Sequence, residues 1–135
     1  MNAECQAGAT APGVQTILVV DDSPMVLQFF GVVLRSAGYH VVEAESAHMA
    51  MAYLNDGHRV DLLLTDYQMP DTNGVELANW FRKKHPGTPV LLVSGLPVLA
   101  QEDSRYDPSV PCRPKSSNPR ELTETVASMF PANAR

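Results

Sequence analysis

From residue 16 onward, the apolar residues of this chain gather in short runs that alternate with longer stretches of mixed polarity. The runs are rich in Val, Ile and Leu and nearly continuous, which is typical of strands buried on both faces of a parallel sheet. The last run contains Pro111 and is followed by Pro114; because proline has no backbone N–H, that strand belongs at a sheet edge. The expected strands are 16–20, 40–43, 60–65, 89–93 and 110–113.

The stretches between these runs carry apolar residues at helical spacing, and most of them begin at a residue suited to an N-cap. Pro24 is a favourable first helical residue, and Gly38 is placed to end that helix. The segment 96–107 predicts only a short or weak helix, because prolines bracket it and its apolar periodicity is poor. The other helices are expected at about 24–37, 47–55, 74–84 and 119–130, with Ser23, Ser46, Asn73 and Asn118 as their caps.

Strands that alternate with helices predict an α/β fold, here a doubly wound five-stranded parallel sheet with a weak fourth helix. We expect one domain over 16–130. Residues 1–15, which are rich in Ala and Gly, are expected to form a flexible lead-in, and 131–135 a short tail. No separate output domain is expected in this chain.

The composition of the chain argues against nucleic acids and membranes as partners. The formal net charge of -5 argues against a general nucleic-acid binder. No apolar run approaches the roughly 20 residues that span a bilayer, and the lead-in lacks the basic start and apolar core of a signal peptide. Cys5 and Cys112 could form at most one disulfide bridge and lack metal-ligand spacing, so a cytoplasmic location is expected. With the charge and the apolar runs, this composition predicts neither membrane nor nucleic-acid partners.

Polar residues follow the expected strands at the point where each one ends. In an open parallel sheet these carboxyl ends lie at one edge, where ligands gather. Carboxylates placed side by side repel each other, and oxygen ligands of this kind suit Mg²⁺. Each residue taken singly reads equally well as a cap, a turn former or a solvated side chain, so the prediction of a site rests on their shared edge. The residues are Asp21, Asp22, Asp66, Ser94 and Lys115.

Five segments in this order resemble the receiver domain of two-component response regulators, of the chemotaxis-regulator type. The resemblance covers about 16–130 and implies the flavodoxin-like strand order 2-1-3-4-5. The segments are 17–23 (ILVVDDS), 61–70 (DLLLTDYQMP), Asn73-Gly74, 90–95 (VLLVSG) and Pro114-Lys115.

The resemblance implies a phospho-accepting signalling switch and not an enzyme. Asp66 would accept a phosphoryl group from a histidine kinase or a phosphotransfer protein. Asp66, Asp22 and the backbone carbonyl of Gln68 would hold Mg²⁺, and Asp21 would act mainly through a metal-bound water. Lys115 would pair with phosphoryl oxygens, and the Ser94 hydroxyl would close on them after transfer. The downstream target stays open, as does a homodimer.

Two departures from the family pattern are expected to matter. Ser116 follows the lysine where the family has Pro in a cis bond; because a cis bond to a non-proline residue costs about 3 kcal/mol, we predict a trans bond. Arg113-Pro114 is an alternative match to the family's Lys-Pro pair, although Lys115 keeps the last helix in register. Cys112 stands where the family commonly has an aromatic ring, which puts the usual output face in doubt.

Two other functions are compatible with parts of this sequence. A degenerate receiver that serves as a constitutive protein-docking module would explain Ser116 and Cys112. A phosphatase of the haloacid-dehalogenase type also uses an Asp after a strand, but it needs a second Asp two residues later as acid and base. Position 68 is Gln, which argues against that enzyme.

Overall fold

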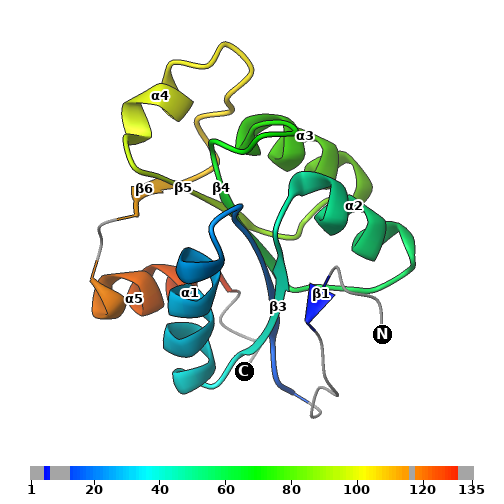
Figure 1. Cartoon of the computed structure of the whole chain (residues 1–135), viewed down its shortest axis with the longest axis vertical. Coiled ribbons are helices and arrows are strands. Elements are labelled where there is room, and N and C mark those ends of the chain that lie inside the picture. Colours follow the sequence, from blue (N-terminus) through cyan, green and yellow to red (C-terminus); the bar gives the residue numbers. More distant parts are fainter. Residues whose placement is uncertain (1–4, 7–12, 116–117, 131–135) are drawn as a thin grey trace.

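The computed structural model describes residues 5–6, 13–115 and 118–130, and it is built around one central sheet (Figure 1). The strand order is β1-β3-β2-β4-β5-β6. The strands are β1 (Cys5–Gln6), β2 (Thr16–Val20), β3 (His40–Ala44), β4 (Leu62–Asp66), β5 (Val90–Ser94) and β6 (Cys112–Pro114). The helices are α1 (Pro24–Ser36), α2 (Ala47–Asn55), α3 (Gly74–Lys84), α4 (Pro97–Gln101) and α5 (Pro119–Met129).

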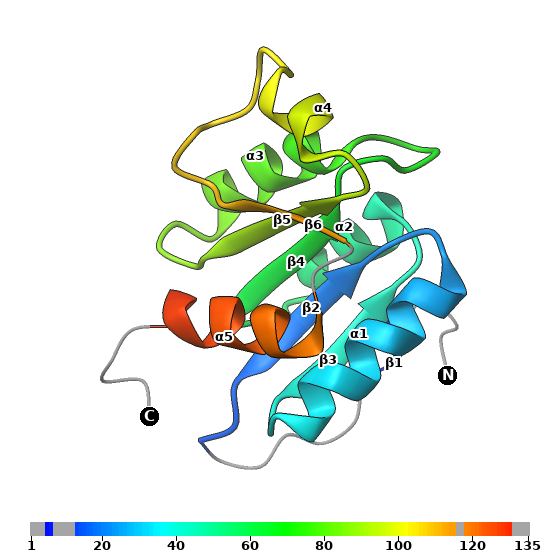
Figure 2. The same cartoon turned by 90° about the vertical axis from the view of Figure 1, so that its left-hand side faces the viewer.

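Helices cover both faces of the sheet. Alternate strand residues pack against α1 and α5 on one face and against α2, α3 and α4 on the other, as Figure 2 shows. All five residues of β2, β4 and β5 are buried, which is why these strands read as continuous apolar runs. Among the described residues, no helix is both long and apolar enough to cross a membrane.

The predicted parallel sheet is confirmed, with one addition. β3, β2, β4, β5 and β6 pair in parallel in the expected order 2-1-3-4-5. β1, however, adds a sixth strand that pairs antiparallel with β3, Cys5 opposite Ala44. It lies within the predicted flexible lead-in, and two residues are too few to produce a periodic signal. It covers the part of the β3 edge formed by Glu43 and Ala44.

The helix ends follow the predicted caps. Ser23, Ser46, Asn73 and Asn118 each accept a backbone N–H three residues later. Gly38 follows the first helix in the left-handed region, at φ 101°. The fourth helix is weak as predicted, because it has only five residues and its cap residue, Leu96, makes no side-chain bond. The last strand begins at Cys112 and not at 110, because the Val110 N–H turns back to the Asp107 carbonyl.

Gly74 sets how closely α3 approaches the end of β4. A Cβ atom at this position would lie 2.3 Å from the Asp66 carbonyl oxygen and 2.8 Å from a Leu92 methyl group. The Gly74 N–H also donates to the Tyr67 carbonyl at 2.7 Å, which closes the loop after β4. Glycine at this position is therefore a requirement of close backbone packing.

Gly74→Ala is expected to lower the free energy of unfolding by at least about 2 kcal/mol, because the clash outweighs the roughly 1 kcal/mol that alanine gains in helix propensity. Urea denaturation measures the difference. Gly95→Ala is the matched control: its Cβ would meet no atom within 4 Å, so a change within about 0.5 kcal/mol is expected. Equal effects of the two substitutions would contradict the packing argument.

Candidate functional site

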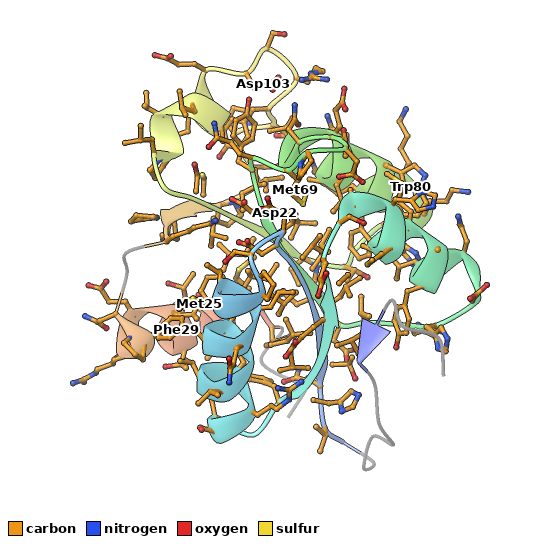
Figure 3. The ribbon with its side chains drawn as sticks, viewed as in Figure 1. Asp22, Met25, Phe29, Met69, Trp80 and Asp103 are labelled. Carbon is orange, nitrogen blue, oxygen red and sulfur yellow. The ribbon has the colours of Figure 1, made fainter. Side chains whose placement is uncertain are left out.

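Three carboxylates meet at the carboxyl edge of the sheet. β2 and β4 are neighbours with Val20 opposite Thr65, so the residues that end these strands come side by side. One oxygen from each of Asp21, Asp22 and Asp66 lies within 4.8 Å of the other two. Asp21 and Asp66 are buried, at 0% and 3% exposure, whereas Asp22 is exposed in the loop that enters α1 (Figure 3). The structure thus brings together the acidic residues that the sequence separates.

Lys115 is the cation of this cluster. Its Nζ lies 2.9 Å from Asp21 Oδ2 and 3.1 Å from Asp66 Oδ2. Its backbone N–H donates to the Ser94 carbonyl at 2.9 Å, which fixes it beyond the end of β5. Arg113 instead donates to the carbonyl of Cys112. The geometry therefore favours Lys115 over Arg113 as the residue that corresponds to the lysine of the family pattern.

Burial shifts the charge balance at Asp66. Loss of hydration raises the pKa of the Asp66 carboxyl and the Asp21 charge raises it further, while Lys115 and a hydrogen bond from the Gln68 backbone oppose the rise without cancelling it. For Lys115, burial by itself lowers the pKa, but the bonds and charges of Asp21 and Asp66 outweigh burial and raise it. The lysine therefore stays charged, and Asp66 ionises at a cost.

The net negative charge of the three carboxylates and the Lys115 ammonium is suited to binding a cation. Asp21 Oδ1 accepts the Ser23 N–H at 2.9 Å, but the buried Oδ2 receives no well-formed hydrogen bond from any described residue. Among the described residues, the cation that lies against this oxygen is the Lys115 ammonium. Three carboxylates against one ammonium leave a formal charge of about -2 when all are ionised. An all-oxygen donor set of this charge suits Mg²⁺.

Ser94 lies near the cluster but uses its hydroxyl locally. The side chain is 1% exposed, donates to the Leu96 carbonyl at 3.0 Å and accepts the Leu96 N–H at 3.1 Å. Both bonds stay within the loop between β5 and α4. The expected contact between Ser94 and a phosphoryl group therefore requires the hydroxyl to give up its bonds to the Leu96 backbone.

The two departures from the family pattern have different outcomes. Cys112 is a buried free thiol opposite Leu92, and burial raises the pKa of the thiol. It offers no ring. The predicted trans bond between Lys115 and Ser116 lies outside the described residues, so it stays a prediction.

Comparison with known proteins identifies the family. The family model of the response regulator receiver domain matches residues 17–103. The chain belongs to this family. The crystal structure of the response regulator protein TrrA from Thermotoga maritima, solved in complex with Mg²⁺ and BeF, superimposes with a TM-score of 0.77 at 29% identity. The superposition covers 87% of this chain and 100% of TrrA.

Curated relatives contain receiver sequence within much longer proteins. The transcriptional regulatory protein GlrR of Escherichia coli (strain K12) is 38% identical over 58% of this chain and 17% of its own length. The sensor kinase CckA of Brucella abortus (strain 2308) is 32% identical over 87% of this chain and 13% of its own length. The chain spans less than a fifth of either relative. The match to the kinase is the more extensive of the two on this chain.

Asp66→Asn is expected to raise the free energy of unfolding at pH 7 without Mg²⁺, by about 1 kcal/mol, because it removes a buried charge that Asp21 repels. A raised pKa in the folded state means that ionised Asp66 costs stability above that pKa. This cost disappears as the pH falls below the ordinary carboxyl range. The gain over the parent should therefore shrink between pH 7 and pH 3.5 in urea denaturation; a gain that grows on acidification would contradict the assignment.

Lys115→Ala is expected to lower the free energy of unfolding at pH 7 by about 2 kcal/mol, because two buried carboxylates lose their counter-charge. This loss is smaller than the loss expected on breaking a fully buried ion pair, because the Lys115 side chain is 26% exposed. Arg113→Ala is the control, with an expected change within about 0.5 kcal/mol. Chemical denaturation of both variants, without divalent metal, measures the difference. A larger loss for Arg113→Ala would reverse the assignment of the family lysine.

Proposed function

We propose that this chain is a phospho-accepting signalling switch and not an enzyme: Asp66 takes a phosphoryl group from a histidine kinase or a phosphotransfer protein, in a reaction that depends on Mg²⁺. The observation that carries the proposal is the buried Asp66 carboxylate, 3.1 Å from the Lys115 ammonium, at a sheet edge that holds two further carboxylates. Membership of the receiver family supports the same role.

In this mechanism an oxygen of Asp66 attacks the phosphorus of a phosphohistidine. The new P–O bond gives an acyl phosphate, the P–N bond breaks, and its electron pair leaves with the imidazole. Lys115, already placed at Asp66 Oδ2, pairs with the charge that develops on the phosphoryl oxygens. Phosphorylation replaces the single charge of the Asp66 carboxylate with a phosphoryl group of about -2, so the negative charge beside Asp21 grows and the Lys115 ammonium has more charge to balance.

Mg²⁺ would be held by Asp22, Asp66 and the backbone carbonyl of Gln68, with Asp21 acting through water. When bound, it supplies charge neutralisation and orientation of the phosphoryl oxygens. The buried Oδ2 of Asp21, which receives no well-formed hydrogen bond from a described residue, and the net negative charge support this assignment. The crystal structure of TrrA, solved in complex with Mg²⁺ and BeF, supports the same assignment.

The switch itself is proposed to act through Ser94. Its hydroxyl would leave the Leu96 backbone and donate to a phosphoryl oxygen, which breaks both bonds that now hold the loop. Leu96 is 61% exposed and α4 is short, so little apolar packing resists this movement. A change at Asp66 would thereby alter the surface around α4.

The second candidate is a receiver that docks constitutively to a partner protein. The observation that favours it is the small buried Cys112, which cannot make the inward swing of an aromatic ring. The clustered carboxylates and the placement of Lys115 favour the phospho-accepting switch instead.

Intact-protein mass after incubation with Mg²⁺ and acetyl phosphate tests the proposal. We expect one added phosphoryl group in the parent and none in Asp66→Asn, and we expect hydroxylamine to remove it because an acyl phosphate is reactive. Chelation of Mg²⁺ should abolish the adduct. Absence of an adduct with both acetyl phosphate and a competent histidine kinase would leave the docking module as the better account.

A further inference from the structure

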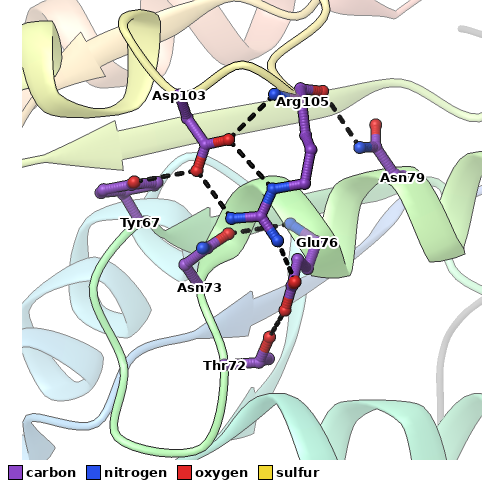
Figure 4. A network of polar contacts seen from close by, with 7 residues as sticks. All are labelled: Tyr67, Thr72, Asn73, Glu76, Asn79, Asp103 and Arg105. Carbon is purple, nitrogen blue, oxygen red and sulfur yellow. Dashed lines mark hydrogen bonds and ion pairs between the residues drawn. The ribbon is translucent and has the colours of Figure 1, made fainter.

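A network of polar side chains ties the segment after α4 to the loop after β4 (Figure 4). Asp103 lies at its centre with only 6% of its side chain exposed. Its Oδ2 accepts the Tyr67 phenol at 3.0 Å and Arg105 Nη2 at 3.0 Å, and its Oδ1 accepts Arg105 Nε at 3.1 Å. The planar guanidinium therefore holds the carboxylate in a two-point contact.

The same arginine connects to α3. It forms an ion pair with Glu76, whose carboxylate also accepts the Thr72 hydroxyl, and its backbone carbonyl accepts the Asn79 amide at 3.1 Å. Hydrogen bonds from Arg105 and Tyr67 lower the pKa of Asp103 to about 2, so it remains ionised at neutral pH. This network has no local sequence signal, because its members come from three separate segments.

Tyr67 is the point where the network reaches the site, since it follows Asp66 directly in the chain. Its backbone N–H donates to the Val93 carbonyl at 2.9 Å, and its carbonyl accepts the Gly74 N–H at 2.7 Å. Further along the loop, Asp71 accepts the His48 N–H at the start of α2 at 2.8 Å. The loop is thus held at both ends; the Tyr67 phenol connects it directly to the segment after α4, and Thr72 connects it indirectly through Glu76.

We propose that Asp103, oriented by Arg105, is a positioning residue for metal binding: through Tyr67 it fixes the loop that presents the Gln68 carbonyl to the Asp22 and Asp66 carboxylates. The inference rests on the proposed Mg²⁺-dependent function. Tyr67 immediately precedes Gln68, so the phenol contact, together with the two backbone hydrogen bonds of Tyr67, limits the orientations open to the Gln68 carbonyl. A metal ligand that is pre-oriented in this way binds with less loss of conformational freedom.

The structure also provides a control for general loosening. Arg82 on α3 pairs with Asp107 at 2.6 Å and so ties the same segment to the same helix. Both side chains are about 40% exposed, comparable to the 46% of Arg105. Neither contacts the loop 67–73 in any described interaction. Loss of this pair should loosen the segment and leave the Gln68 carbonyl in place.

The experiment measures Mg²⁺ affinity by isothermal titration calorimetry on the full chain for the parent, Tyr67→Phe, Asp103→Ala, the double variant and Arg82→Gln. Tyr67→Phe removes a single hydroxyl, so its fold is secure even if Asp103→Ala is destabilised. We expect each single variant of the pair to weaken Mg²⁺ binding by about 3- to 10-fold, somewhat less than the loss of a group bonded directly to a ligand. The double variant should be no weaker than Asp103→Ala, because the two act through one bond.

Two further results are expected. Arg82→Gln should bind Mg²⁺ as the parent does, and saturating Mg²⁺ should restore the rate of phosphorylation by acetyl phosphate in Tyr67→Phe. Parental Mg²⁺ affinity in Tyr67→Phe and Asp103→Ala, with a parent that binds Mg²⁺ and is phosphorylated, overturns this inference alone. An equal loss in Arg82→Gln also overturns it, because general loosening would then be sufficient. A parent that neither binds Mg²⁺ nor accepts a phosphoryl group overturns the inference together with the proposed function.

Discussion

Two carboxylates buried side by side against one ammonium are the constraint on which the rest of this molecule depends. Asp21 and Asp66 end neighbouring parallel strands, and the pairing of β2 with β4 leaves them no room to separate. Lys115 reaches both from beyond β6 but cannot balance both and Asp22 as well. The carboxylates at this edge of the sheet therefore repel one another in the folded chain. A bound cation or protonation of Asp66 reduces that repulsion.

The core makes this cost tolerable. Helices on both faces bury the three central strands completely, so the sheet edge is held rigidly in spite of the repulsion. The hydrophobic contribution of that core is distributed over two clusters, one on each face. Residues placed for function commonly lower the stability of a protein at the site, and burial in the surrounding core offsets this loss.

The loops around the site are held in unequal ways. The loop after β4 is closed by the Gly74 N–H and fastened through Tyr67 and Asp71, whereas the loop after β5 is held mainly by the Ser94 hydroxyl. The loop after β4 is thus fastened to neighbouring elements, whereas the hydroxyl bonds of the loop after β5 stay within that loop. The proposed switch would use this asymmetry, because the loop after β5 would exchange its bonds while the loop after β4 stays in place.

Much of this followed from local patterns in the sequence. Continuous apolar runs predicted the buried strands, and Ser23, Asn73 and Asn118 predicted the helix starts, because capping depends on residues a few positions apart. The strand-end residues and the family resemblance predicted the site, although the roles of its residues remain predictions. The short pairing of β1 and the link from Asp103 to Tyr67 could not be predicted in this way.

Only the tertiary structure decided how those residues act on one another. The sequence favoured Lys115 by the register of the last helix but kept Arg113 as an alternative, and the distances to Asp21 and Asp66 support Lys115. It placed Ser94 at the sheet edge, but the direction of its hydroxyl depended on the loop geometry. The physical reason is one of range: capping and burial patterns act over a few residues, whereas the pairing of Lys115 with Asp21 joins groups that are far apart in the chain and that folding brings to 2.9 Å from each other.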